Sequence, residues 1–427
     1  MIGPVEQYDD EQIAAVLGVA EEPQPEPPEP VDLRRVVDDF FGPESPLRAA
    51  GSLGLRQFEE RPQQREMARA IADSIVAGTH LCVEAPTGVG KTFAYLVPAI
   101  HAALTSGLPV VVSTHTISLQ EQIVERDLPL LKKLMGLDFR FAIAKGRGNY
   151  LCRRRLESAA DHDRDYLPSP ALVPEMEKVR QWAQDTRDGS RSDLDFEPTP
   201  AVWDTVCCEV GNCLGGRCPH FRNCFLMRAR MRLLRSQVIV ANHALFFIDM
   251  AMKRDMNYAP EAGLLPPYGL VILDEGHCVE DTAAVNLGVR ISAFTVRKLL
   301  RRLFNPDRNR GLLTDVMYTE QRMTVLRVQE QCERFFRRLH EWAEVQEDNP
   351  LRYTCPGHVP DLIGDGLGEV ATQALNLSRE ETDEGRQTEL ASIAERLRGC
   401  REAVRTVLDM ALENHVYWIE RYGSDLR

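Results

Sequence analysis

The chain has 427 residues, 44% hydrophobic and 27% charged, and its 51 Lys and Arg against 64 Asp and Glu give a formal charge of −13. This composition is typical of a globular protein with room for two or three domains. It excludes a collagen-like repeat, a small disulfide-stapled scaffold and a fully disordered chain. The acidic balance argues against a surface that binds nucleic acid throughout, but it is compatible with a local basic patch.

The sequence contains no run of about 18 apolar residues, so no membrane span is predicted. Met1–Asp10 lacks the basic and then apolar pattern of a signal peptide. We therefore expect a cytoplasmic protein without a membrane partner. The eleven cysteines do not predict a disulfide framework, because the cytosol is reducing. Clustered cysteines there indicate a metal or cluster site instead.

Residues 1–45 are predicted to form a disordered acidic tail, since Glu21–Pro30 consists almost entirely of Pro and Glu. Short helices are expected on either side of that run, at 9–17 and 31–41. From residue 58 onward, apolar periodicity predicts helices and strands in alternation. The predicted helices are 63–77, 92–104 and 118–134, and the predicted strands are 79–84, 108–113, 238–241 and 270–273.

This alternation is typical of βαβ units, so an α/β fold with a parallel sheet is predicted for residues 46–290. The two late strands are continuous apolar runs, which predicts burial on both faces. A cysteine-rich stretch at 146–235 interrupts the alternation and is interpreted as an insertion. Residues 291–427 are predicted to be helical, because long amphipathic stretches occur at 294–304, 318–345 and 389–413.

A phosphate-binding loop is predicted between a strand and a helix, in the run Ala85-Pro86-Thr87-Gly88-Val89-Gly90-Lys91-Thr92. Small residues allow several backbone N–H groups to converge on phosphate oxygens, and the helix N-terminus adds a favourable dipole. We expect Lys91 to reach the β- and γ-phosphates of ATP and the Thr92 hydroxyl to bind Mg²⁺. A glycine-rich turn that only packs a helix on a sheet is the alternative.

An acidic pair, Asp274 and Glu275, follows the predicted strand 270–273. A carboxylate at the carboxyl end of a strand is suited to hold Mg²⁺, and a second one to polarise the attacking water. We assign the first role to Asp274 and the second to Glu275, and we expect His277 to couple the nucleotide site to a neighbouring lobe. An isolated acidic pair is usually a solvated loop, but after a phosphate loop it is the expected partner motif.

Six of the eleven cysteines cluster, and three of them have the spacing Cys-x₄-Cys-x₅-Cys. Four thiolates are able to hold either tetrahedral Zn²⁺ or a [4Fe–4S] cluster. The wide and even spacing favours the larger cluster over zinc, and ordinary buried cysteines are the remaining alternative. The predicted ligands are Cys152, Cys213, Cys218 and Cys224, while Cys207 and Cys208 stay unassigned.

Between Arg217 and Arg235 there are six arginines and no acidic residue. Such a run is able to neutralise phosphates, and Phe221 and Phe225 within it are candidates for stacking on the bases of single-stranded DNA. A solvated helix face is the alternative interpretation.

Together these motifs resemble the DinG/XPD-type iron–sulfur DNA helicases of superfamily 2, in their bacterial DinG branch, over most of residues 58–290. The run from Arg61 to Met67 is similar to the family's adenine-reading Q motif, with Gln64 as the reader. Val110–Gln122 is similar to motif Ia, which touches the single-strand backbone, and Val240–Leu245 matches the strand before the Asp-Glu-x-His box. The cysteine spacing matches the family's cluster ligands, which favours [4Fe–4S].

The resemblance implies a RecA-like motor domain with an inserted Fe–S cluster domain at 146–235 and a helical arch domain at 291–427, which together enclose DNA. It also implies ATP-dependent translocation on single-stranded DNA, 5′ to 3′, and unwinding of forked duplex DNA.

A second RecA-like domain, with its Ser-Ala-Thr box and arginine finger, is not found. A missing segment or a separate chain is expected to supply it, and hydrolysis without it is expected to be slow. The alternative function is a catalytically incomplete nucleotide- and metal-cluster-binding module for single-stranded DNA.

Overall fold

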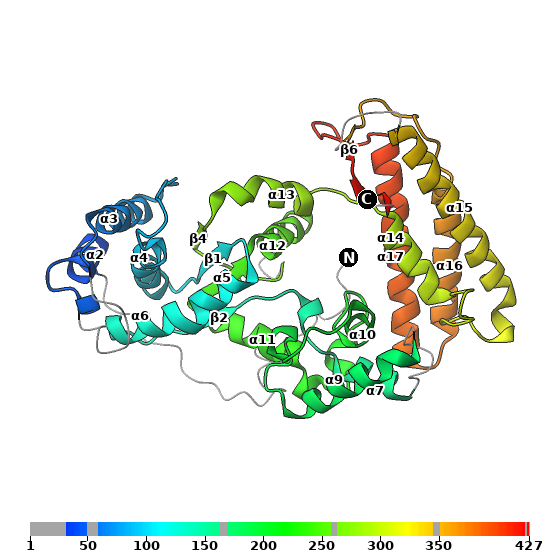
Figure 1. The fold of residues 1–427 in the computed structure, drawn as a ribbon, viewed down its shortest axis with the longest axis horizontal. Helices are drawn as coiled ribbons and strands as arrows, with labels where there is room; N and C mark the ends of the chain where they lie inside the picture. Colours follow the sequence, from blue (N-terminus) through cyan, green and yellow to red (C-terminus); the bar gives the residue numbers. More distant parts are fainter. Residues whose placement is uncertain are drawn as a thin grey trace. The chain divides into compact units, whose positions relative to one another are not determined.

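The computed structural model describes residues 31–48, 59–161, 169–257, 263–344, 351–422 and 425–426. The chain divides into two compact units (Figure 1). The sheet unit comprises the described residues up to 146 together with 227–287, and the helical unit comprises 147–226 and those from 288 onward. The Pro- and Glu-rich run and the predicted helix at 9–17 lie outside the described residues.

The sheet unit is built on four parallel strands in the order β2-β3-β1-β4. Successive residues of β1 face opposite sides, because Val110 and Val112 pack into one core and Val111 into another. The predicted α/β fold with a parallel sheet is thus confirmed. The strands are β1 (Val110–Thr114), β2 (Phe141–Ile143), β3 (Val238–Asn242) and β4 (Leu270–Leu273).

Helices cover both faces of this sheet. Residues of α2 (Leu33–Phe41), α3 (Pro62–Ala77), α4 (Lys91–Ser106) and α6 (Leu128–Met135) share the core on one face. The other face packs against α12 (His243–Asp255) and α13 (Val279–Leu287). Between β1 and α6 the chain forms α5 (Ile117–Gln122) and a π-helical turn (Ile123–Asp127), and α11 (Phe225–Leu234) runs across the boundary between the units.

Three expectations about this unit were wrong. Residues 79–84 form no strand, and the exposure of Leu81 and Val83 shows that no neighbouring strand covers them. Strand β4 is only partly buried, because β1 is its single partner among the described strands. The disordered tail does not extend to residue 45, since Leu33, Val37 and Phe40 recur at helical spacing and bury the inner face of α2.

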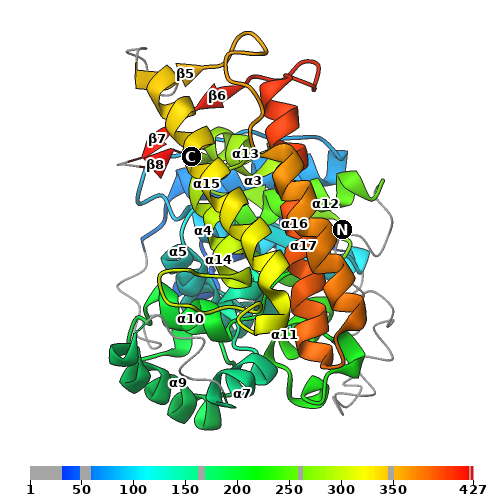
Figure 2. The same ribbon diagram turned by 90° about the vertical axis from the view of Figure 1, so that its right-hand side faces the viewer.

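The helical unit contains a cysteine segment (147–226) and a helical bundle (288–422). The bundle helices run side by side and share one hydrophobic core (Figure 2). They are α14 (Ala293–Leu303), α15 (Thr319–Glu344), α16 (Gly364–Glu380) and α17 (Glu384–Leu408). Three of the four were anticipated as amphipathic stretches.

The remaining elements of the helical unit are short. The cysteine segment holds α7 (Arg153–Asp161), α9 (Val173–Asp185) and α10 (Pro200–Val206). Two small antiparallel pairs, which were not predicted, are β5 (Leu351–Arg352) with β6 (Trp418–Ile419) and β7 (Arg421–Tyr422) with β8 (Asp425–Leu426). Single 3₁₀ turns occur at Arg147–Asn149, Pro170–Leu172, Arg191–Asp193, Gly215–Arg217, Phe221–Asn223 and Val316–Tyr318, and in the sheet unit at Gly276–Cys278.

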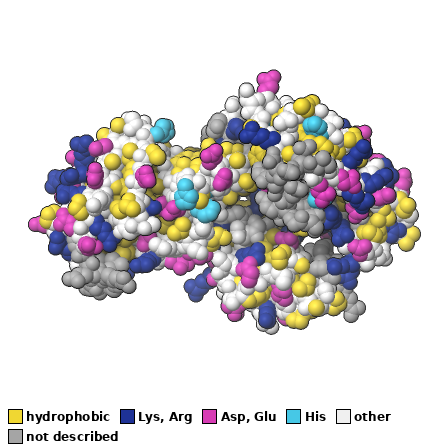
Figure 3. Space-filling view, turned by 45° about the horizontal axis from the view of Figure 1, so that its top comes forward, with side chains coloured by type: hydrophobic (Ala, Val, Ile, Leu, Met, Phe, Trp, Pro, Cys, Tyr) yellow, Lys and Arg dark blue, Asp and Glu magenta, His cyan; other side chains and the backbone are white. Residues whose placement is uncertain are grey.

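Basic and acidic side chains are interspersed on the face drawn in Figure 3, so the acidic total is not spread as a uniform negative surface there. Over the part of the chain that the structure describes, no helix has both the length and the apolar character needed to cross a bilayer.

Candidate nucleotide and cysteine sites

The predicted phosphate loop leads directly into α4, whose first residue is Lys91. Gly88 and Gly90 have φ angles of 87° and 89°, in the left-handed region that other residues rarely adopt. Gly90 is also the N-cap of α4, so the N–H groups of the first helical turn open toward the loop. The loop therefore has the conformational freedom and the helix terminus that a phosphate site requires.

Two side chains from the start of α3 hold this loop. Arg61 donates to the Gly88 carbonyl, and the Gln64 amide Nε2 donates to the Gly90 carbonyl at 2.8 Å. Gln64 is buried, and a Cβ on Gly90 would lie 2.2 Å from its Nε2. The structure thus assigns Gln64 a contact with the loop backbone, and its adenine-reading role stays a prediction.

The acidic pair lies at the carboxyl end of β4 and faces the first residue of α4. Lys91 Nζ is 3.7 Å from Glu275 Oε1, while Asp274 accepts a hydrogen bond from the Tyr95 hydroxyl at 3.2 Å. Burial, followed by the negative charge of Asp274, raises the pKa of Tyr95 well above its ordinary value, so this phenol stays protonated and remains a donor. His277 is 75% exposed and lies 3.5 Å from Glu275.

Glu275 has a φ angle of 56°, which is uncommon for a residue with a side chain. This conformation ends β4 abruptly and leads into the turn Gly276–Cys278. Backbone outliers of this kind concentrate at functional sites. The Lys91 ammonium group and the carboxylates of Asp274 and Glu275 thus lie together beside the glycine loop. A cation suits a nucleotide phosphate, and carboxylate oxygens suit Mg²⁺.

The predicted cysteine ligands come together in the cysteine segment. Cys208 interacts electrostatically with Cys152, Cys213 and Cys224, and Cys218 interacts with Cys152 and Cys213. A hydrogen bond from Cys208 lowers the pKa of the Cys152 thiol to about 6, although burial opposes this. In the described ranges no three His, Cys, Asp or Glu side chains converge tightly enough for a single metal ion.

The two unassigned cysteines have different surroundings. Cys208 hydrogen bonds to Cys152, and this bond, with burial, raises the pKa of Cys208 well above its ordinary value. Cys207 is buried beside Arg155, which donates to its carbonyl. The sequence assigned no role to either cysteine, and the structure places Cys208 among the predicted ligands.

Residues 61–161 match the DEAD/DEAH box helicase family. The ATP-dependent DNA helicase YoaA of Haemophilus influenzae is 30% identical over 386 residues, which cover 87% of this chain and 56% of the relative. The ATP-dependent helicase DinG of Mycobacterium tuberculosis is 38% identical over 259 residues, covering 57% of this chain and 38% of the relative. The chain is thus similar to DinG-type helicases. It spans about half the length, or less, of these curated relatives.

One expectation about the arginine run was wrong. Phe221 and Phe225 are buried, at 5% and 1% exposed, so neither ring is free to stack on a base. Phe225 packs against Gly189, and the Arg153 guanidinium lies 4.5 Å from its ring centroid. The arginine run is also divided, because Arg217 and Arg222 belong to the helical unit and the other four to the sheet unit.

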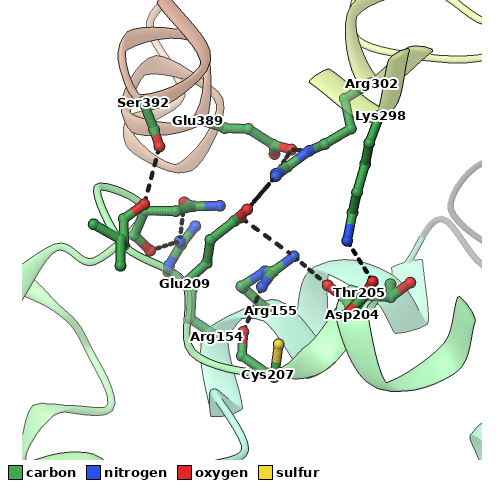
Figure 4. Close-up of polar contacts among 12 residues, drawn as sticks. Arg154, Arg155, Asp204, Thr205, Cys207, Glu209, Lys298, Arg302, Glu389 and Ser392 are labelled. Atoms are coloured by element: carbon green, nitrogen blue, oxygen red, sulfur yellow. Dashed lines mark hydrogen bonds and ion pairs between the residues drawn. The ribbon is translucent and has the colours of Figure 1, made fainter. Parts of the chain in front are cut away.

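Sequence reasoning missed a charge network between the cysteine segment and the helical bundle (Figure 4). Glu209, one residue after Cys208, accepts from Arg302 of α14 at 2.6 Å and from Arg396 of α17 at 2.5 Å. Lys298 pairs with Asp204, and Ser392 donates to the Val210 carbonyl at 3.1 Å. In the sequence, the position of Glu209 directly after Cys207 and Cys208 was the only sign of this network. Its partners are distant in sequence, so no local pattern revealed them.

Proposed function

We propose that this chain is the first motor half of an ATP-dependent DNA helicase, which couples ATP hydrolysis to translocation on single-stranded DNA, 5′ to 3′, and to duplex unwinding. The observation that carries the proposal is the approach of Lys91 to Glu275 at 3.7 Å, beside Asp274 and the left-handed glycine loop. The relatives named above are ATP-dependent helicases, and the chain spans only part of their length.

The nucleotide would lie over the run Ala85–Thr92. Lys91 neutralises the β- and γ-phosphates, Thr92 and Asp274 hold Mg²⁺, and Glu275 orients the attacking water. When bound, Mg²⁺ supplies charge neutralisation at the transferred phosphate. Tyr95 keeps the Asp274 carboxylate in place through its 3.2 Å hydrogen bond, and the exposed His277 is available to a neighbouring lobe.

We further propose that Cys152, Cys213, Cys218 and Cys224 hold a [4Fe–4S] cluster. Support comes from the mutual electrostatic interactions of thiols in the cysteine segment, because a cubane is held by four thiolates. A backbone N–H of Arg155 adds to the lowered pKa of Cys152, whereas burial raises the pKa of Cys218 despite a backbone hydrogen bond from His220. Zinc, held by the same four thiolates, is the competing metal.

The DNA partner, as single strands and as forked duplex, is proposed from the relatives. A groove of about 700 Å³ beside α15 adds support. It is lined by Arg334, Arg337 and Arg338 together with Gln331, Glu341 and Leu362, and no partner is found for the three guanidinium groups within the described ranges. Exposed, unpaired guanidinium groups along one helix face are suited to phosphates.

A second RecA-like lobe, supplied by a further segment or by a separate chain, would complete the motor. Support comes from exposed apolar side chains of the sheet unit: Leu273 of β4, whose single partner among the described strands is β1, is 42% exposed, and Leu81 and Val83 are 46% and 40% exposed. An unpaired strand edge with exposed apolar side chains is suited to pack against more chain.

MgATP binding and DNA-stimulated hydrolysis test the proposal. We expect the chain to bind MgATP, to hydrolyse it slowly and to do so faster with single-stranded DNA, because the arginine finger is not among the motifs found. Lys91→Ala should lose nucleotide binding, whereas the exposed Lys133→Ala should behave as wild type. Binding of nucleotide and DNA without any hydrolysis would favour the non-catalytic binding module instead.

A further inference from the structure

His243 joins two loops at the carboxyl edge of the sheet. It is the first residue of α12, directly after β3, and it is 1% exposed. Its Nδ1 lies 2.7 Å from the Ser113 hydroxyl, at the end of β1, and its Nε2 lies 2.9 Å from the carbonyl oxygen of Asp274, at the end of β4. Strand β1 lies between β3 and β4. The imidazole, which follows β3, therefore contacts both the neighbouring strand β1 and the end of β4 beyond it.

The two contacts decide which ring nitrogen carries the proton. A carbonyl oxygen only accepts, so Nε2 carries hydrogen and donates to Asp274. In the neutral ring Nδ1 then has a free lone pair, and it accepts from the Ser113 hydroxyl. The result is a directed chain of hydrogen bonds from Ser113 through His243 to Asp274, in which no other tautomer satisfies both ends.

Both ends of this series of hydrogen bonds lie in segments that we propose to be functional. Ser113 begins Ser113-Thr114-His115-Thr116, the segment likened to the DNA-touching motif, in which His115 and Thr116 are exposed. Asp274 is the proposed Mg²⁺ ligand. A backbone hydrogen bond of 2.8 Å from Asp274 N to the Ser113 carbonyl runs beside the imidazole, so a displacement of Ser113 acts on Asp274 through two contacts.

We propose that His243 is a positioning residue that couples DNA contact at Thr114–Thr116 to the placement of Asp274 at the nucleotide. The proposal rests on the function proposed above. When DNA displaces the loop after β1, Ser113 moves the imidazole, and the imidazole moves the Asp274 carbonyl and with it the carboxylate. Ser113 and His243 are both buried, so their mutual hydrogen bond has no water as an alternative partner and moves with either residue.

Reciprocal binding tests this coupling. We would measure the affinity of the chain for the magnesium complex of a non-hydrolysable ATP analogue, with and without a saturating oligo-dT strand. Coupling between sites is typically about 5- to 150-fold, and it must be equal when DNA affinity is measured with and without nucleotide. We expect at least about 5-fold in wild type.

Three variants separate the two hydrogen bonds. In His243→Gln the amide lies near the Nε2 position and keeps the bond to Asp274, and in His243→Asn it lies near the Nδ1 position and keeps the bond to Ser113. Ser113→Ala removes the donor at the far end. Each should reduce the coupling to less than about 2-fold, and Ser113→Ala combined with His243→Asn should cause no further loss. The exposed His80→Gln is the matched control and should retain full coupling.

The outcomes are distinguishable. Variants that melt like wild type and keep full coupling would overturn the role of His243, as would a wild-type chain that binds both ligands independently. A wild-type chain that binds neither nucleotide nor DNA would overturn the proposed function itself. If the His243 variants unfold, Ser113→Ala decides, because it deletes a single oxygen atom.

Discussion

Arg302 donates from one guanidinium nitrogen to both carboxylate oxygens of Glu209, at 2.6 and 2.7 Å, and its other nitrogens bond to Glu389. Residues 93 positions apart in sequence are thereby joined in the helical unit. Burial works against charging Arg302, yet the two carboxylates raise its pKa further above its ordinary value. Glu209 is therefore the acid that holds the cysteine segment against α14 and α17.

Neutralising Glu209 should destabilise the helical unit. Glu209→Gln leaves the Arg302 and Arg396 guanidinium groups without their shared carboxylate, and breaking a buried pair typically costs about 3–5 kcal/mol. All four tryptophans, at 182, 203, 342 and 418, belong to the helical unit, so tryptophan fluorescence during urea unfolding reports on this unit alone. Glu330→Gln, at an exposed position without an ion pair among the described residues, is the control and should change stability by less than about 0.5 kcal/mol.

The same carboxylate should make stability depend on pH. Burial raises the pKa of Glu209, but the charges of Arg302 and Arg155 outweigh it and lower the pKa to about 2, from 4.5. A lowered pKa in the folded state contributes stability that is present above pH 4.5 and is lost as the pH falls toward 2. The difference between 4.5 and about 2 corresponds to about 3 kcal/mol. The wild-type advantage over Glu209→Gln in urea midpoint should stay constant between pH 6 and pH 5 and shrink as the pH falls below 4.5 toward 3. A difference that stays constant down to pH 3 would contradict this assignment.

A methyl group on Gly90 should disturb the phosphate loop. Gly90→Ala places a Cβ 2.2 Å from the Gln64 amide nitrogen and forces a left-handed backbone on alanine. We expect MgATP affinity to fall at least about 10-fold, which is about 1.4 kcal/mol. Gly78→Ala has the same left-handed strain but no atom near its Cβ, so it should leave nucleotide affinity within about twofold. Equal effects of the two variants would show that strain alone is responsible.

Serine substitutions should distinguish a cysteine that binds the proposed cluster from one that only lies nearby. Cys213→Ser should abolish bound iron and acid-labile sulfide in anaerobically purified protein, because a cubane needs all four thiolates. Cys207→Ser should retain both, since Cys207 has its contacts with Arg155 and the protein core. Zinc without sulfide in the wild-type protein would contradict the cluster assignment.

Removing the three arginines on α15 should change the salt dependence of DNA binding. For single strands, the slope of log affinity against log salt becomes shallower by about 0.7 for each phosphate that the protein no longer neutralises. Replacing Arg334, Arg337 and Arg338 together by Gln should therefore reduce the magnitude of this slope by about 2. Arg187, Arg308 and Arg379 are exposed but scattered over the helical unit, and their joint replacement is the control. An unchanged slope with the α15 variant would exclude this groove from the DNA path.

Local features of this protein were predictable from the sequence. The periodicity of Gln63–Ala77 and of the α4 region, and the order of small residues before Lys91, predict the helices and the loop, because each depends on residues within one or two turns. The DinG resemblance rests on such contiguous runs. Cys213, Cys218 and Cys224 form a local spacing pattern, and the more distant Cys152 joined them through the family resemblance.

Tertiary structure decided what depends on distant partners. Residues 79–84 are apolar enough for a strand, but a strand exists only where another offers its hydrogen bonds, and none does so in the described sheet. The burial of Phe225 under Arg153, the place of Cys208 beside Cys152, and the reach of His243 from Ser113 to Asp274 all join distant parts of the chain. The sequence by itself determined the chemical groups and the family resemblance, and folding determined which of these groups meet, because contact distance and burial are properties of the packed chain.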